Sequence, residues 1–120
     1  MSMQNELASL NRAVALDRVG GDVGLLHEIA GLFLEEYPKL LGDIRKAIAA
    51  SEPQKLERAA HSLKGSVGNF GAAPAFQAAL SLEMLGRQGE LDKAPAALAQ
   101  LENALKQLEP ELAALISSMP

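Results

Sequence analysis

The longest hydrophobic pattern in the chain runs from residue 26 to residue 48, where apolar residues recur at helical spacing. They step by three and four positions, as on one buried face of an α-helix, and are Leu26, Ile29, Ala30, Phe33, Tyr37, Leu40, Leu41, Ile44 and Ile48. Pro38 lies inside this pattern, where a proline removes a backbone hydrogen bond and bends a helix. Because the pattern keeps its phase across Pro38, it predicts one kinked helix, with two separate helices as the alternative.

Capping and helix-breaking residues predict one further helix on each side of this one. Asn11 can cap a short helix that ends near residue 19, and Asp22 can cap the long helix, since both side chains accept hydrogen bonds from free backbone N–H groups. Pro53 suits the first position of a later helix, which we expect to continue to about Asn69. Gly71 then ends it.

The carboxy-terminal half predicts two more helices. The first runs from about Ala73 to Gln88, with Gly86 interrupting it near its end and Gly89 closing it. A helical wheel places four residues on one broad side of this helix and Leu82 at the edge of that side; the four are Phe76, Ala79, Leu80 and Glu83.

The last predicted helix can be capped by Asp92 and has Pro95 in its first turn, while Pro110 should kink it late. Leucines form its stripe, at positions 98, 101, 105, 108, 112 and 115. Such a stripe can also be a coiled-coil seam between two chains. Its short length, and the other helices that need cover, favour packing within one chain, so we expect a monomer.

These elements predict the fold class and the domain organisation. No stretch shows the sustained alternation of a β-strand. Four main helices joined by short loops indicate an all-α, antiparallel four-helix bundle with a short additional N-terminal helix. We expect residues 11–120 to form this bundle as one domain, and residues 1–10 to be a flexible arm.

Composition narrows the classes of function. The chain has 120 residues and a net charge of −4, whereas a general nucleic-acid binder usually carries a basic excess. It has no cysteine, which excludes disulfides and thiolate chemistry and fits a reducing cytoplasm. No apolar run approaches the ~18 residues of a membrane span, and no signal peptide is visible. We therefore expect a cytoplasmic protein whose chain contacts neither nucleic acid nor membrane.

His61 is the best candidate for chemistry. On the wheel of its helix it points away from the buried stripe of Leu56, Ala59, Ala60, Leu63, Val67 and Phe70, and shares the outer face with Glu57, Lys64, Gly65 and Gly68. Each glycine costs a helix roughly 1 kcal/mol relative to alanine, yet both leave space beside the imidazole. With Lys64 in reach, this arrangement suits an arriving anion such as phosphate. The alternative is an ordinary solvated histidine near a glycine that only ends the helix.

The sequence gives little support for hydrolytic, nucleotide-binding or metal-dependent chemistry. No positioned-nucleophile motif or second histidine accompanies Ser62 or Ser66, which argues against a hydrolase triad. The only other histidine is His27, which we interpret as a surface residue without a ligand partner. No glycine-rich loop lies between a strand and a helix, so the chain should not bind ATP or phosphorylate itself. We expect no metal site and no cofactor bound by this chain.

The sequence around His61 resembles a known family. The stretch Ala60-His61-Ser62-Leu63-Lys64-Gly65-Ser66, followed by Asn69-Phe70-Gly71-Ala72, is similar to the phosphorylation motif of histidine-containing phosphotransfer (Hpt) domains. Two earlier stretches and a later one also resemble this family: Arg18-Val19-Gly20-Gly21-Asp22, Leu32-Phe33-Leu34-Glu35-Glu36-Tyr37-Pro38 and Leu82-Glu83-Met84-Leu85-Gly86-Arg87. The resemblance covers roughly residues 12–115.

The resemblance implies a phosphocarrier of multistep two-component relays rather than an enzyme that turns over alone. His61 would accept a phosphoryl group at Nε2 from the phosphoaspartate of a response-regulator receiver domain, which would supply Mg²⁺. Lys64 would neutralise the phosphoryl oxygens, Gly65 would give the receiver access, Gly68 would extend that clearance or serve helix packing, and Arg87 aligns with a position near the site in some members.

The resemblance also indicates where partners dock and which alternatives stay open. The docking surface should surround His61 and include the exposed side of the long helix, with the short N-terminal helix as an extension. A hybrid sensor kinase is a further expected partner. The alternatives are an Hpt module phosphorylated directly by a kinase ATP-binding domain, and a helical interaction domain that is not phosphorylated.

Overall fold

The first two helices of the computed structural model, which describes residues 10–117, both begin at a capping side chain. In α2 (Arg12–Arg18) the Asn11 side chain accepts a hydrogen bond from the N–H of Val14 at 3.2 Å. In α3 (Val23–Ala49) the Asp22 carboxylate accepts one from the N–H of Leu25 at 3.0 Å. Both predicted caps are confirmed.

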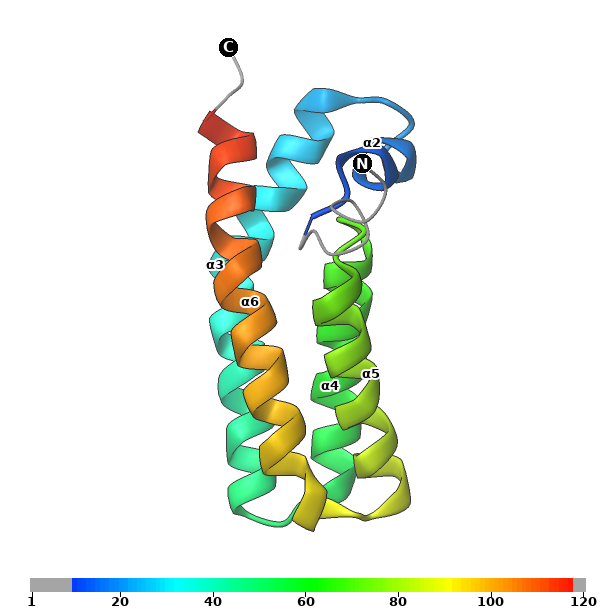
Figure 1. Ribbon diagram of the computed structural model, residues 1–120, viewed down its shortest axis with the longest axis vertical. Helices are drawn as coiled ribbons and strands as arrows, with labels where there is room; N and C mark the ends of the chain where they lie inside the picture. Colours follow the sequence, from blue (N-terminus) through cyan, green and yellow to red (C-terminus); the bar gives the residue numbers. More distant parts are fainter. Residues whose placement is uncertain (1–9, 118–120) are drawn as a thin grey trace.

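Helix α3 runs unbroken through Pro38, so the prediction of a single helix is confirmed and the two-helix alternative is wrong. Its direction changes along its length, and the amino-terminal part leans away from the rest (Figure 1). Leu26, Ala30, Phe33, Leu41 and Ile44 are buried, as the pattern predicts. The remaining stripe residues are partly buried and pack against the core.

Helices α4 (Pro53–Gly68) and α5 (Ala73–Gln88) form the most extensively packed pair in the described chain. Pro53 is the first residue of α4, and its predicted stripe from Leu56 to Phe70 is buried. Gly71 has a φ of +58°, and a Cβ there would lie 2.6 Å from the Cβ of Asn11. The turn after α4 therefore needs glycine both for its conformation and for its contact with the residue that caps α2.

The predicted buried side of α5 is partly wrong. Leu82 is fully buried instead of lying at the edge, whereas Leu80 is only partly buried. Because α5 packs against both α4 and α6 (Ala94–Ser117), its buried arc is wider than one stripe. Gly86 does not interrupt the helix, which continues to Gln88 and ends at Gly89 with a φ of +73°.

The start of the last helix also differs from the prediction. Asp92 lies in a short 3₁₀ helix, η1 (Leu91–Lys93), and α6 begins only after it, at Ala94. Asp92 is therefore not the cap of α6, because it lies inside the 3₁₀ helix and Lys93 stands between it and the first α-helical residue. Pro95 lies in the first turn, as predicted, and α6 continues without a break through Pro110.

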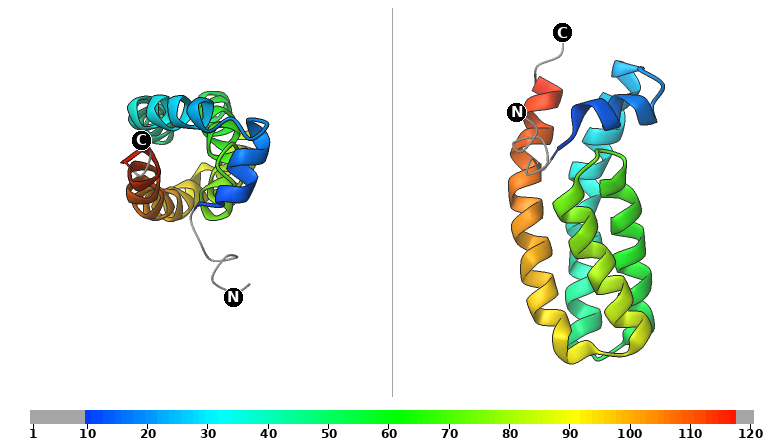
Figure 2. Two further views of the ribbon diagram at one scale, coloured as in Figure 1. Left: turned by 90° about the horizontal axis from the view of Figure 1, so that it is seen from above. Right: turned by 45° about the vertical axis from the view of Figure 1, so that its right-hand side comes forward.

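The four long helices stand side by side around one core, and α2 lies across one end of the bundle (Figures 1 and 2). The backbone N–H of Asn11 joins this end to the α4–α5 turn by donating to the carbonyl of Phe70 at 2.9 Å. The largest fully buried side chains come from all four long helices and the turn after α4: Phe70, Leu26, Ile44, Leu56, Leu63, Leu82, Leu101, Leu108, Leu112 and Val67. The predicted four-helix bundle is confirmed.

The leucine stripe of α6 is part of this core, since Leu101, Leu105, Leu108, Leu112 and Leu115 are buried within the chain. It is therefore not an uncovered seam. Nine residues of the predicted N-terminal arm, 1–9, lie outside the described residues, as do residues 118–120. Leu10 is described, and its N–H donates to the Glu111 carboxylate at 2.9 Å. None of the described helices is long and apolar enough to cross a membrane.

Candidate functional site

His61 projects from the middle of α4, on the side opposite the residues that hold this helix in the core. Its side chain is 67% exposed, whereas its neighbours Ala60 and Leu63 are fully buried. The core therefore fixes the helix and leaves the imidazole accessible. The prediction that His61 points away from the buried stripe is confirmed.

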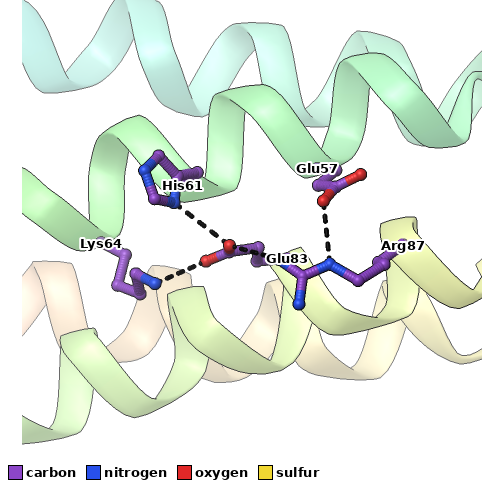
Figure 3. Close-up of polar contacts among 5 residues, drawn as sticks. All are labelled: Glu57, His61, Lys64, Glu83 and Arg87. Carbon is purple, nitrogen blue, oxygen red and sulfur yellow. Dashed lines mark hydrogen bonds and ion pairs between the residues drawn. The ribbon is translucent and has the colours of Figure 1, made fainter.

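Glu83 of α5 lies directly beneath the imidazole and is the functional residue that the sequence analysis missed. Its side chain is only 5% exposed, and its Oε2 lies 3.1 Å from Nδ1 of His61. Its Oε1 pairs with the Lys64 ammonium at 2.8 Å, and its Oε2 also accepts a hydrogen bond from Arg87 at 3.0 Å. Figure 3 shows these groups converging on the one carboxylate.

These partners keep Glu83 ionised despite its burial. The hydrogen bond from Lys64 is the largest cause that lowers the pKa of Glu83 below its ordinary value, and the hydrogen bond to His61 lowers it further. Burial acts in the opposite direction because it disfavours the charged form. The cations prevail, so the carboxylate is charged at neutral pH.

An ionised Glu83 fixes the tautomer of His61. A carboxylate without a proton can only accept hydrogen bonds, so Nδ1 must be the nitrogen that carries the hydrogen. In the neutral ring the other nitrogen, Nε2, then has a free lone pair. In that form of the ring, the distal nitrogen is the one available as a nucleophile.

Arg87 extends the network across the two helices. Its Nε donates to the Glu57 carboxylate on α4 at 2.9 Å, while its other contact is Glu83 on its own helix, four residues earlier. The hydrogen bond to Glu57 is the largest cause that raises the pKa of Arg87. His61, Glu57 and Glu83 therefore share one polar cluster that joins α4 to α5 (Figure 3).

A shallow cleft of about 620 Å³ opens beside this cluster. Its walls are made by Glu57, Arg58, His61, Ser62, Glu83 and Arg87. An exposed nucleophilic nitrogen, a buried carboxylate behind the ring and cations nearby form an arrangement that can accept and hold an anionic electrophile.

A protein-family model described as the Hpt domain matches residues 28–111, which include α4 and α5 in full. The chain belongs to the Hpt domain family. It is accordingly a histidine phosphocarrier of phosphorelays, and Hpt domains carry phosphoryl groups without being kinases. No curated protein sequence matches the chain significantly.

The fold of this Hpt domain matches that of a solved structure, histidine-containing phosphotransfer protein B from Pseudomonas aeruginosa PAO1. The two chains superimpose with a TM-score of 0.87 at 24% sequence identity. The match covers 95% of this chain and 99% of that chain, so it includes the whole bundle.

The structure of the Hpt domain agrees with the predicted roles of some site residues and not of others. Gly65 is exposed, and a Cβ built there meets nothing within 4 Å, which agrees with the predicted open space. At Gly68 a Cβ would lie 3.6 Å from the ring of Phe76, so this glycine faces α5 and its packing alternative is favoured. The Lys64 side chain is only 20% exposed and pairs with Glu83 rather than extending freely beside His61.

His27 is not the free surface residue that the sequence suggested. It is partly buried, and its Nε2 lies 3.1 Å from the backbone carbonyl of Leu115 on α6. The prediction considered only ligand partners near His27 in sequence, whereas the observed partner is 88 residues away. Among residues 10–117 no group of three or more His, Asp or Glu side chains is placed to hold a metal ion.

Gly86 was interpreted as an interruption, but it allows α4 and α5 to approach closely. A Cβ at Gly86 would lie 2.7 Å from the backbone N of Glu57 and 2.8 Å from the carbonyl oxygen of Pro53. Gly86 lies three residues after Glu83, and Glu57 lies four residues before His61. The helices therefore meet backbone to backbone within one turn of both site residues.

Proposed function

We propose that His61 is the phosphorylated histidine of this Hpt domain and that its Nε2 carries the phosphoryl group. The supporting observation is the hydrogen bond between Nδ1 and the buried Glu83, which occupies Nδ1 on an exposed side chain and leaves Nε2 as the nitrogen without this partner. His27, the other histidine in the chain, is a weaker candidate because its Nε2 already contacts the Leu115 carbonyl.

The proposed transfer needs no proton to leave the ring. The lone pair of Nε2 forms a bond to phosphorus while the bond between phosphorus and the aspartyl oxygen of the donor breaks, and the donor regains its carboxylate. The ring becomes cationic as this bond forms. Glu83 stabilises that charge through the hydrogen bond from Nδ1, in the manner of a carboxylate behind a catalytic imidazole. The reverse step follows the same path.

We propose response-regulator receiver domains as donor and acceptor, with Mg²⁺ held by the receiver, since phosphoryl transfer depends mainly on positioning and on neutralising charge. Lys64 contributes by holding Glu83 in place. Arg87 restrains Glu57, whose negative charge would otherwise oppose the arriving phosphoryl group. We expect the carrier to act as a cytoplasmic monomer.

The exposed apolar residues support the expected docking face. Among the described residues the large exposed hydrophobic side chains are Val14, Val23, Leu25, Leu32 and Met84, and only Met84 lies outside α2 and α3. Leu32 is 53% exposed and lines a groove with Ser66 of α4 and with Asn69, which directly follows α4. A receiver seated on Nε2 can cover this apolar groove across Gly65.

The proposal is tested by phosphotransfer from a phosphorylated receiver to wild type, His61→Gln and His27→Gln. We expect acid-labile label on wild type and on His27→Gln, and none on His61→Gln. Nitrogen NMR of the labelled ring should place phosphorus on Nε2. Label that persists in His61→Gln would refute the assignment. Label obtained from a kinase ATP-binding domain but from no receiver would favour the direct-kinase alternative.

A further inference from the structure

A second cleft, of about 450 Å³, lies next to the His61 site, between the carboxyl end of α3 and the amino end of α4. Its charged and polar walls are Asp43 and Lys46 from α3, Glu52 before α4, and Lys55, Arg58 and Ser62 from α4. Cations outnumber carboxylates here, although the chain as a whole has a net charge of −4. The excess of cations in this cleft therefore does not follow from the overall composition.

Both carboxylates of the cleft already have partners. Asp43 pairs with Lys39 at 3.6 Å, and Glu52 pairs with Lys55 at 3.0 Å. Within the described residues, Lys46 and Arg58 have no carboxylate within ion-pairing distance. The cleft is thus left with two cations whose charge is not compensated.

The cleft is continuous with the His61 site. Arg58 and Ser62 line both clefts, and Arg58 precedes His61 by three residues, about 4.5 Å along the helix axis. A stable protein–protein interface covers roughly 800 Å² on each partner, much more than one imidazole and its neighbours. A protein domain that reaches Nε2 is therefore large enough to cover the mouth of the second cleft as well.

We propose that Lys46 and Arg58 form a recognition site for carboxylate side chains on the docking surface of the receiver domain. This inference rests on the proposed function and adds the charge that the partner must carry. Arginine binds a carboxylate with two parallel hydrogen bonds, and a nearby lysine adds a point charge. Opposite charges across an interface speed encounter and select the partner more than they raise affinity.

The test compares two routes of phosphorylating His61 in folded, full-length protein. One route uses a phosphorylated receiver, which must dock; the other uses phosphoramidate, a small donor that needs no protein contact. The variants are Lys46→Glu and Arg58→Glu, with Lys106→Glu as the control. Lys106 is an exposed residue of α6 with no ion pair among the described residues, and it lines a different groove, between α3 and α6.

We expect Lys46→Glu and Arg58→Glu each to slow transfer from subsaturating receiver about fivefold at low salt, a typical scale for reversing one interfacial charge. The difference should shrink at high salt, where exposed charges are screened. Labelling by phosphoramidate should be unchanged, and Lys106→Glu should behave as wild type in both assays.

Three results would overturn this inference. Equal slowing by Lys106→Glu would show an effect of net charge alone. Unchanged transfer from the receiver would show that the cleft does not contact it. Loss of phosphoramidate labelling in Lys46→Glu and Arg58→Glu would place the defect in His61 itself. The proposed function fails separately, if wild type is labelled by neither donor at His61.

Discussion

Replacing Glu83 by glutamine tests the centre of the site with a minimal change of shape. The amide keeps one oxygen that can accept the hydrogen from Nδ1 of His61, but it removes the negative charge. It also turns an N–H₂ group toward a cluster that contains two cations, Lys64 and Arg87. We expect this variant to be less stable and to accept phosphate more slowly.

The size of the stability loss follows from the exposure of the partners. Removing one member of a fully buried ion pair costs about 3–5 kcal/mol, whereas an exposed pair contributes about 0–1 kcal/mol. His61 and Arg87 are 67% and 61% exposed and can be rehydrated, but Lys64 is only 20% exposed. We therefore expect a loss of about 2 kcal/mol at pH 7, or a fall of roughly 8 °C in melting temperature.

The pH dependence gives this prediction a definite sign. Because the pKa of Glu83 is lowered in the folded state, its contribution is complete above the ordinary glutamate pKa of about 4.3 and disappears as pH falls through the folded-state value. Chemical denaturation of wild type and Glu83→Gln should therefore give stabilities that differ at pH 7 and converge in acid. Glu28→Gln, at an exposed carboxylate on α3, is the matched control.

The same variant separates the role of Glu83 in stability from its role in transfer. Without the carboxylate, the cationic ring formed during transfer loses its counter-charge, so phosphorylation of His61 should slow about tenfold or more, as for other groups that orient an imidazole. Stability equal to that of Glu28→Gln, or a difference that persists in acid, would refute the electrostatic reasoning. An unchanged transfer rate would refute the role of the Glu83 charge in transfer.

Substitutions at three further positions test the packing and titration of other parts of the bundle. Gly65→Ala should stabilise the helix by about 1 kcal/mol because its Cβ meets open space. Gly65→Phe should fold, but it should block transfer from a receiver and leave labelling by phosphoramidate intact. Equal loss with both donors would contradict this prediction. Gly86→Ala should destabilise by about 3 kcal/mol in denaturant unfolding, as overpacking does, because its Cβ would overlap the backbone of Glu57 and Pro53; a neutral effect would show that α5 can shift freely. Burial raises the pKa of Tyr37 to about 12. Stability that is present below pH 10 should therefore be lost as the pH rises toward 12. Unfolding measured as a function of pH should show this loss in wild type and not in Tyr37→Phe.

Much of the fold follows from the sequence because local rules dominate in this bundle. Asn11, Asp22 and Pro53 set helix starts through their own backbone neighbours, and the buried stripes follow the helical period. Asp92 shows where local rules fail, since a capping residue can be followed by a 3₁₀ turn as well as by an α-helix. Which of the two forms depends on how the chain passes from α5 to α6, and the sequence near Asp92 does not determine this path.

Only part of the site could be predicted from the sequence, for a related reason. The exposure of His61 and the space at Gly65 follow from one helix, but Glu83 becomes important only when α5 is placed against α4. A signal was present, because a glutamate on an apolar face needs a buried partner. The ion pair of Lys64 was missed for the same reason, because its partner lies on another helix.

The close approach of α4 and α5 at Gly86 sets a constraint on how this protein can vary. The hydrogen atom that serves as the side chain of Gly86 lets Glu83 come within hydrogen-bonding distance of His61, and that contact decides which ring nitrogen is nucleophilic. Under the proposed function, a residue with no polar side chain would thereby control which nitrogen is phosphorylated. A search for variants that have lost phosphotransfer should find substitutions at residue 86 as readily as at residues that carry charge.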